Sequence, residues 1–286
     1  MEWRGRRGSR NVEDRRGMGR AGAGGLSVAG ILVVLAVAYF FGIDISPIMG
    51  AIEGAGQGGG QGAPTRELTA AERETGEFAS VVLADTEEVW ARVLREQAGR
   101  DYRAPRMVLF SGQVDSACGG ASAAMGPFYC PGDESLYLDT DFFRVMREQM
   151  GAPGDFAAAY VIAHEVGHHV QNLLGTLGQV NAMRARLDPA AANRLSVLTE
   201  LQADCHAGIW ARRAQQMLGT IEPGDIDEAI RAAAAVGDDV LMKKAGRAPM
   251  PDAFTHGSAA QRQEWFMRGH DSGRLEDCDS FAAAQM

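Results

Sequence analysis

The feature that most constrains this chain is a His-Glu-x-x-His sequence inside an apolar run at residues 159–171. His164 and His168 are four residues apart, so on a helix both imidazoles lie on one face and can bind the same metal ion. Glu165 is the next residue round, where it can reach a water molecule on that metal. The apolar surroundings predict a buried helix. Such a pattern arises by chance in roughly one chain in a hundred of this length, so other residues must support it.

A hydrolytic zinc site takes three protein ligands and keeps one position for water. Glu200 is the best candidate for the third ligand, on a long helical pattern that begins at Pro189. Asp204 is four residues further on, faces the same way, and is expected to hold the second ring nitrogen of a ligand histidine. The alternative is that Glu200 and Asp204 are simply solvated charges on a helix surface. The apolar residues around them disfavour this, because an unpaired carboxylate is costly in a half-buried helix. His206 and His169 are off the ligand face and are weaker candidates.

The predicted chemistry is hydrolysis with one Zn²⁺ per chain. Zinc lowers the pKa of water, and Glu165 is expected to act as general base and then to protonate the leaving amine. The oxyanion needs a further donor. His256 is the first choice, although a loop or capping histidine is an equal alternative. Tyr160, one turn before His164, is the second choice, with a core tyrosine as the competing interpretation.

The charge of the chain is uneven. Its 286 residues carry a net charge of −9, yet residues 1–25 hold seven Arg against three acidic residues. The rest is therefore strongly acidic, which argues against nucleic acid as a partner. Residues 1–24 are predicted to be a basic cytoplasmic tail.

Residues 25–43 contain no charged side chain and are close to the ~20 residues that cross a bilayer. We expect a single transmembrane helix there, with the Arg-rich side in the cytoplasm and the body across the membrane. This places the protein in the cell inner membrane with a periplasmic catalytic domain. A signal peptide cleaved after Ala36-Val37-Ala38 would cut the apolar run short, and a buried core helix fits poorly beside so polar a flank.

A Gly-rich linker at 44–65 separates this segment from a predicted catalytic domain at 66–286. The domain is expected to be α+β and mostly helical. Three short strands are predicted as a small antiparallel sheet, which either offers an edge to an extended peptide or is purely structural. The predicted helices cover residues 68–97, 141–150, 189–218, 223–236 and 259–269, and 238–244 is the alternative continuation of the helix at 223–236. The His-Glu helix is predicted to begin at Asp155 and to end at Gly175 or Gly178. The predicted strands cover 107–110, 128–130 and 136–138.

The chain has four cysteines, Cys118, Cys130, Cys205 and Cys278. In an oxidising compartment they can form disulfides in three pairings. Pairing Cys118 with Cys130 would close a loop between strands, and pairing Cys205 with Cys278 would attach the C-terminal tail to the helix of Glu200. Free buried thiols are the alternative. The sequence contains no Cys-x-x-Cys spacing, so a cysteine metal site is not expected.

Several stretches together resemble a known family, the membrane-anchored neutral zinc metallopeptidases of bacteria, which are similar in motif to the thermolysin-like gluzincins. They are residues 11–17, 126–131, 164–171, 200–205, 237–239, 256–258 and 261–262. The resemblance implies a thermolysin-like zincin core with His164, His168 and Glu200 as zinc ligands and Glu165 as base. It implies no defined substrate.

The sequence thus predicts a membrane-anchored zinc endopeptidase, with a protein or peptide substrate and the membrane as partners. The alternative is a non-catalytic, zinc-containing, membrane-tethered binding or assembly protein. Glu165 speaks against it, because a structural zinc site is closed and needs no base. Another amide, such as a cell-wall crosslink, would use the same chemistry.

Overall fold

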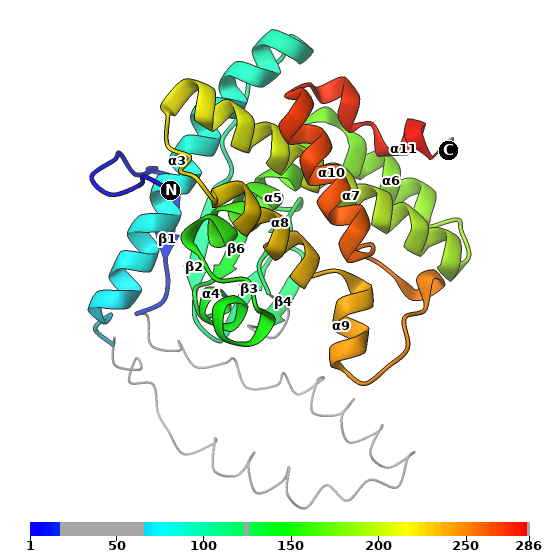
Figure 1. Ribbon diagram of the computed structural model, residues 1–286, viewed down its shortest axis with the longest axis horizontal. Coiled ribbons are helices and arrows are strands. Elements are labelled where there is room, and N and C mark those ends of the chain that lie inside the picture. The colour runs from blue at the N-terminus through cyan, green and yellow to red at the C-terminus, as the bar shows by residue number, and fades with distance from the viewer. Residues whose placement is uncertain (18–65, 123–125, 285–286) are drawn as a thin grey trace, which may run out of the picture. The chain divides into compact units, whose positions relative to one another are not determined.

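The computed structural model describes residues 1–17, 66–122 and 126–284, and helices form most of it (Figure 1). The longer helices are α3 (Ala70–Ala98), α5 (Asp155–Leu174), α6 (Thr176–Arg184), α7 (Pro189–Leu218), α8 (Asp225–Ala235) and α10 (Ala259–Ser272). Shorter ones are α4 (Asp141–Val145), the π-helix η2 (Met146–Met150), α9 (Asp238–Lys244), the 3₁₀ turns η3 (Pro251–Ala253) and η4 (Leu275–Cys278), and α11 (Ser280–Ala283). The α+β, mostly helical fold class is confirmed.

The strands form two small sheets. The larger has the order β1-β2-β6-β5, made of β1 (Val12–Asp14), β2 (Arg106–Phe110), β6 (Ser135–Asp139) and β5 (Phe128–Cys130). The hairpin β3 (Gln113–Ser116) and β4 (Gly119–Ser122) forms the other.

The expected antiparallel sheet is correct only for β5 and β6, because β2 pairs in parallel with both β1 and β6. Parallel strands need a long connection, because the chain must return to the same end of the sheet before the second strand begins. The β3–β4 hairpin and β5 lie between β2 and β6 in the chain and provide that connection. All five residues of β6 are buried, and β6 is an interior strand of this sheet, parallel to β2 and antiparallel to β5.

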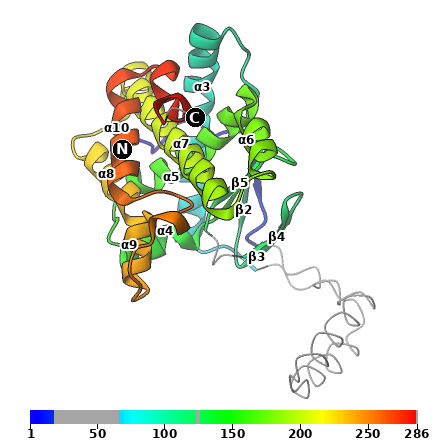
Figure 2. The same ribbon diagram turned by 90° about the vertical axis from the view of Figure 1, so that its right-hand side faces the viewer.

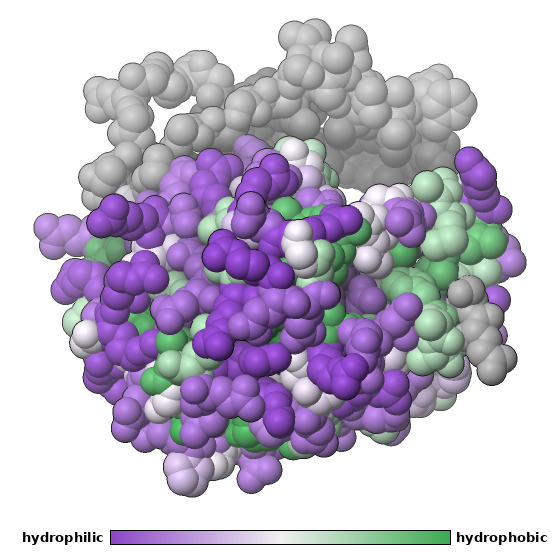
Figure 3. All heavy atoms as spheres, turned by 90° about the horizontal axis from the view of Figure 1, so that it is seen from above, coloured by the Kyte–Doolittle hydropathy of each residue, from purple (hydrophilic) through white to green (hydrophobic). Residues whose placement is uncertain are grey.

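Helix α5, which carries the His-Glu sequence, lies between the sheet and the helices α7, α8 and α10 (Figures 1 and 2). It is apolar on nearly every side and is buried along most of its length, as predicted. Hydrophilic residues dominate the described part of the face in Figure 3, so the apolar side chains of these helices are mainly directed inward.

Two close helix crossings bring α7 against its neighbours. A Cβ atom at Gly208 on α7 would lie 2.0 Å from the carbonyl oxygen of Phe266, and one at Gly269 on α10 would lie 1.9 Å from that of Cys205. Both contacts are far too short, so only glycine lets these backbones touch. Gly167 on α5 plays a similar part, since its Cβ would lie 2.9 Å from the Ala203 oxygen on α7.

Two disulfides join Cys118 to Cys130 and Cys205 to Cys278. The predicted pairs are therefore present, and no cysteine is free. The first ties the β3–β4 hairpin to β5, and the second ties the C-terminal turn η4 to α7.

The N-terminal residues belong to the folded body. Residues Met1–Arg15 group with Ala70–Met286 in one compact unit. The first 15 residues of the expected separate tail are thus part of the folded body, because β1 pairs with β2 and Trp3 is buried in the core. Sequence patterns could not predict the pairing of β1 with β2, because it joins residues about 95 positions apart.

The expected transmembrane segment 25–43 and the whole linker 44–65 lie outside the described residues. Among the residues that are described, no helix is both long enough and apolar enough to cross a membrane.

Candidate metal centre

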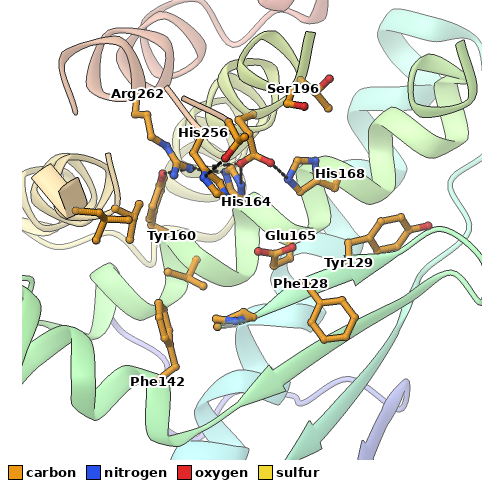
Figure 4. A pocket seen from close by; sticks show the side chains of 18 of the residues that line it. Phe128, Tyr129, Phe142, Tyr160, His164, Glu165, His168, Ser196, His256 and Arg262 are labelled. Carbon is orange, nitrogen blue, oxygen red and sulfur yellow. Dashed lines mark hydrogen bonds and ion pairs between the residues drawn. The ribbon is translucent and has the colours of Figure 1, made fainter. Parts of the chain in front are cut away.

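Three potential metal ligands converge from two helices. His164 and His168 come from α5 and Glu200 comes from α7, and one donor atom of each lies within 4.8 Å of the others. The Nε2 atom of His164 is 3.1 Å from Oε2 of Glu200, and that of His168 is 3.4 Å from Oε1 (Figure 4). Two imidazole nitrogens and a carboxylate oxygen are a donor set that suits zinc.

The second nitrogen of His164 is held by a buried carboxylate. Its Nδ1 atom donates to Oδ1 of Asp204 at 2.9 Å, and Asp204 has no exposed surface. This bond places the proton on Nδ1 and leaves Nε2 free to bind a metal. The role expected of Asp204 therefore agrees with its position.

The second nitrogen of His168 is held in a different way. Its Nδ1 atom donates to the side-chain oxygen of Gln171 at 2.8 Å. The amide nitrogen of Gln171 donates to the carbonyl oxygen of Thr199 at 2.7 Å, which turns its oxygen toward His168. Gln171 thus fixes the tautomer of the second histidine, a role that the sequence did not indicate.

Arg262 supports the whole arrangement from α10. Its Nε and Nη2 atoms donate to the two oxygens of Asp204 at 2.8 and 2.9 Å, in a two-pronged pair. The guanidinium is only 3 % exposed, so this pair is shielded from water. Asp204 contacts His164, so Arg262 supports this candidate ligand through Asp204. Its Nη2 atom also lies 3.3 Å from Nδ1 of His164 and 4.0 Å from Oε2 of Glu200.

The two glutamates of the site have opposite electrostatics. Burial raises the pKa of Glu165, and the nearby imidazoles of His164 and His168 only partly oppose this. Burial would also raise the pKa of Glu200, but the two histidines outweigh it and hold that pKa well below its usual range. Glu200 is therefore the stable anion of the pair, and Glu165 is the group with the greater affinity for a proton.

His256 lines the same cavity from the loop before α10. Its Nδ1 atom donates to Oδ1 of Asp238 at 3.2 Å, and Oδ2 of Asp238 accepts the backbone N–H of Thr255, His256 and Gly257 at 2.7, 2.7 and 3.0 Å. The hydrogen bond to Asp238 raises the pKa of His256, against the opposing effect of burial. One carboxylate thus shapes the loop and favours the charged imidazole.

Tyr160 also lines the cavity, but its hydroxyl donates to Asp204. It is 1 % exposed and supports the same carboxylate as Arg262. The geometry therefore favours His256 over Tyr160 as a donor to substrate.

The remaining candidate histidines lie apart from the three ligands. His169 donates from Nε2 to the carbonyl oxygen of Arg103 at 2.6 Å, and its Nδ1 contacts the hydroxyl of Tyr129. His206 contacts the carbonyl oxygen of Gly167, and burial lowers its pKa to about 4. Both are structural histidines.

The ligands open onto a cavity of about 900 Å³. Glu165 points into it near Phe128 (Figure 4). Phe128 and Tyr129 belong to β5, which within the described residues pairs only with β6 and so forms an edge of the sheet. Much of the remaining wall is apolar, from Phe142, Val145, Met150, Val161, Leu177, Val180, Val236 and Leu241.

Arg262, Asp238 and Gln171 had no predicted role. The only signal in the sequence was their presence in the stretches that resemble the peptidase family. Their partners are 58, 18 and 3 residues away, and for the two long separations only the fold reveals the contact.

Two histidines and a glutamate beside a buried carboxylate, all facing an open cavity, are the arrangement of a metal site with room for a reactant. The sequence profile of the family described as "Putative neutral zinc metallopeptidase" matches residues 1–281, and the chain belongs to this family.

The chain is 43% identical to "Uncharacterized protein YpfJ" of Escherichia coli K12 over 98% of its own length and 99% of the relative. It is 50% identical to "Uncharacterized protein Rv2575" of Mycobacterium tuberculosis H37Rv over 65% of each chain. No solved structure matches it.

Proposed function

We propose that this protein is a zinc-dependent peptidase of the gluzincin type, with His164, His168 and Glu200 as metal ligands. The observation that carries the proposal is Glu165, a buried carboxylate that faces the cavity next to the ligands without being one of them. When bound, zinc supplies an acidified water and polarises a substrate carbonyl. A site that held zinc only for structure would have no use for such a base.

The residues of the chain divide the remaining work. Glu165 accepts a proton at its carboxylate from the attacking water and passes it to the leaving amine, a task for which burial has raised its pKa. His256, whose pKa is raised by its hydrogen bond to Asp238, donates a hydrogen bond to the oxyanion. Asp204 and Gln171 hold the two ligand histidines in the tautomers that leave Nε2 for the metal.

The edge strand β5 supports a peptide as the substrate. Phe128 and Tyr129 line the cavity, and the backbone of β5 pairs with β6 on one side only among the described strands. An extended peptide can add to such an edge by main-chain hydrogen bonds, which would draw its carbonyl groups along the metal ligands.

The cellular setting is part of the proposal. Two disulfides favour an oxidising compartment for the folded body, and the charge-free run 25–43 favours attachment to the membrane. We therefore propose an extracytoplasmic, membrane-attached peptidase.

The substitution Glu165→Gln tests the catalytic assignment. It removes the base but keeps the shape of the side chain, so cleavage of a peptide library should fall at least about 100-fold, the usual contribution of a general base, while zinc stays bound. Metal content is measured on the same samples by mass spectrometry. The matched control is Glu264→Gln, an exposed glutamate on α10 that should leave cleavage unchanged. Full activity of Glu165→Gln would refute the mechanism, and bound zinc without cleavage by the wild type would favour the non-catalytic alternative.

A further inference from the structure

The first 15 residues of the chain are built into the same sheet as the body. Strand β1 runs parallel to β2 in the register Val12 to Met107 and Asp14 to Leu109. The pairing continues past both ends of the strand, since the Met107 N–H donates to the Asn11 carbonyl and the Arg15 N–H donates to the Leu109 carbonyl, each at 2.8 Å. β1 is therefore a regular member of the sheet.

The residues before β1 are anchored by a buried aromatic side chain. Trp3 is 5% exposed and belongs to the main hydrophobic core. Its ring meets that of Phe78 on α3 edge to face, with centroids 5.4 Å apart, and Phe78 in turn meets Phe143 at 6.3 Å. Figure 1 shows this segment, in blue, running beside α3 and β2.

Polar residues of the segment also form ion pairs and hydrogen bonds with helix α3. Arg6 pairs with the buried carboxylate of Asp85 on α3, and Arg4 pairs with Glu74 at 2.6 Å on the same helix. The side chain of Asn11 donates to Glu87 at 2.8 Å. Arg4, Arg6 and Asn11 thus attach the segment to helix α3 by polar contacts as well as by packing.

We infer that residues 1–15 and 70–286 lie on the same side of any membrane that this protein meets. Strands joined by hydrogen bonds cannot be separated by a hydrocarbon layer of about 30 Å. Arg15 and Ala70, which bound the intervening segment, therefore lie in one compartment. A run of 19 uncharged residues at 25–43 has the length for one helical crossing and not for two, so a single crossing cannot coexist with the paired β1.

This inference revises the orientation expected from the sequence. The basic N-terminus goes with the disulfide-bonded body, so both would face the same side of a lipid bilayer. It also gives residues 11–17 a purpose, because most of them form or flank β1. The inference does not depend on zinc or on catalysis. It can therefore fail while the proposed peptidase activity is confirmed, and the activity can fail while the inference is confirmed.

Cysteine labelling in membranes tests the inference on the full chain. All four native cysteines are in disulfides, so Arg10→Cys and Met250→Cys each introduce a single exposed thiol, one in each part. A membrane-impermeant maleimide is applied to right-side-out and to inverted vesicles. We expect both variants to be labelled from the same face. Labelling from opposite faces would overturn the inference.

A crosslink across the sheet gives a second measurement. Val12→Cys with Met107→Cys places two thiols at paired positions of β1 and β2, and a protease site is inserted between residues 50 and 64. After cleavage of the membrane-bound protein, the two fragments should stay joined without reductant and separate with it. The control pair Val12→Cys with Met250→Cys should not join them. Fragments of the test pair that separate without reductant would show that β1 is unpaired in the membrane and would also overturn the inference.

Discussion

Arg262 is a buried residue that supports the candidate metal ligands mainly through a second side chain, Asp204. Its guanidinium neutralises Asp204, and Asp204 holds the proton-bearing nitrogen of His164. Charges buried this deeply are stable only when paired, so the loss of Arg262 would leave Asp204 with an uncompensated charge. A protonated Asp204 could no longer orient His164 in the same way.

Substitution of Arg262 should therefore weaken metal binding. Arg262→Met is expected to lower zinc affinity by about 10- to 100-fold, the usual effect of losing support for a ligand histidine. Arg262→Lys should recover part of it, because lysine restores the charge without the two-pronged geometry. Affinity is measured by competition with a chelator, and Arg268→Met, at an exposed site on the same helix, is the control. Unchanged affinity in Arg262→Met would contradict the assignment.

Asp238 should set the pH at which His256 loses its proton. Its hydrogen bond raises the pKa of His256, so the charged pair persists below that raised pKa and is lost as the pH rises through it. Asp238→Asn should lower the pKa toward about 6.5 and move the alkaline limit of activity to lower pH. NMR titration of the His256 ring and the pH profile of kcat/KM measure the two effects. Asp252→Asn, at an exposed position, serves as control, and an unmoved titration would exclude the proposed coupling.

At the scale of elements, the site depends on the close crossing of α7 and α10. Gly208 and Gly269 allow the two backbones to touch, and this contact carries Arg262 to Asp204. The ends of α10 are well defined, with a Ser258–Gln261 capping box at the start and Gly273 in a left-handed conformation at the end. The helix therefore approaches α7 as a rigid element.

An added methyl group at this crossing should separate the helices. Gly269→Ala places a Cβ atom where the Cys205 oxygen lies, and such overpacking costs about 1–3 kcal/mol or more of unfolding free energy. Zinc affinity should fall as well, because Arg262 moves with α10. Gly178→Ala is a matched control in helix α6, where a Cβ atom meets nothing within 4 Å and the change should be neutral or stabilising. Urea unfolding measures both variants, and equal stability would argue against the tight crossing.

At the scale of the whole molecule, the two disulfides close loops of very different length. Cys118 and Cys130 are 12 residues apart, whereas Cys205 and Cys278 are 73 apart. A longer closed loop restricts the unfolded chain more strongly. The second bond also fixes the C-terminal turn to α7, the helix of Glu200 and Asp204.

Removal of the longer crosslink should cost more stability. Replacing both Cys205 and Cys278 by Ser is expected to lower the free energy of unfolding by about 4 kcal/mol, against about 3 kcal/mol for Cys118 and Cys130. Equilibrium unfolding in urea of the two double variants, each against the wild type, gives the comparison. The reverse order would mean that local packing, and not chain entropy, dominates.

The sequence by itself was enough to nominate the residues of the candidate metal centre. The spacing of His164 and His168 is a local property of a helix, and the apolar run around them predicts burial without any knowledge of the fold. Glu200 and Asp204 were found by the same reasoning, as a pair on one face of a second helix. The helices α3, α5, α7, α8 and α10 and the strands β2, β5 and β6 were also predicted close to their observed bounds, whereas α6 and the β3–β4 hairpin were not predicted.

The tertiary structure alone decided how distant segments meet. The N-terminal residues read as a basic tail, yet they form β1 and fill the core with Trp3, because their partners are β2 and α3, far along the chain. The parallel pairing of β2 with β6 and the contact of Arg262 with Asp204 have the same origin. Periodicity reports which face of an element is buried, but pairing between elements depends on packing and charge across long separations, which no local pattern records.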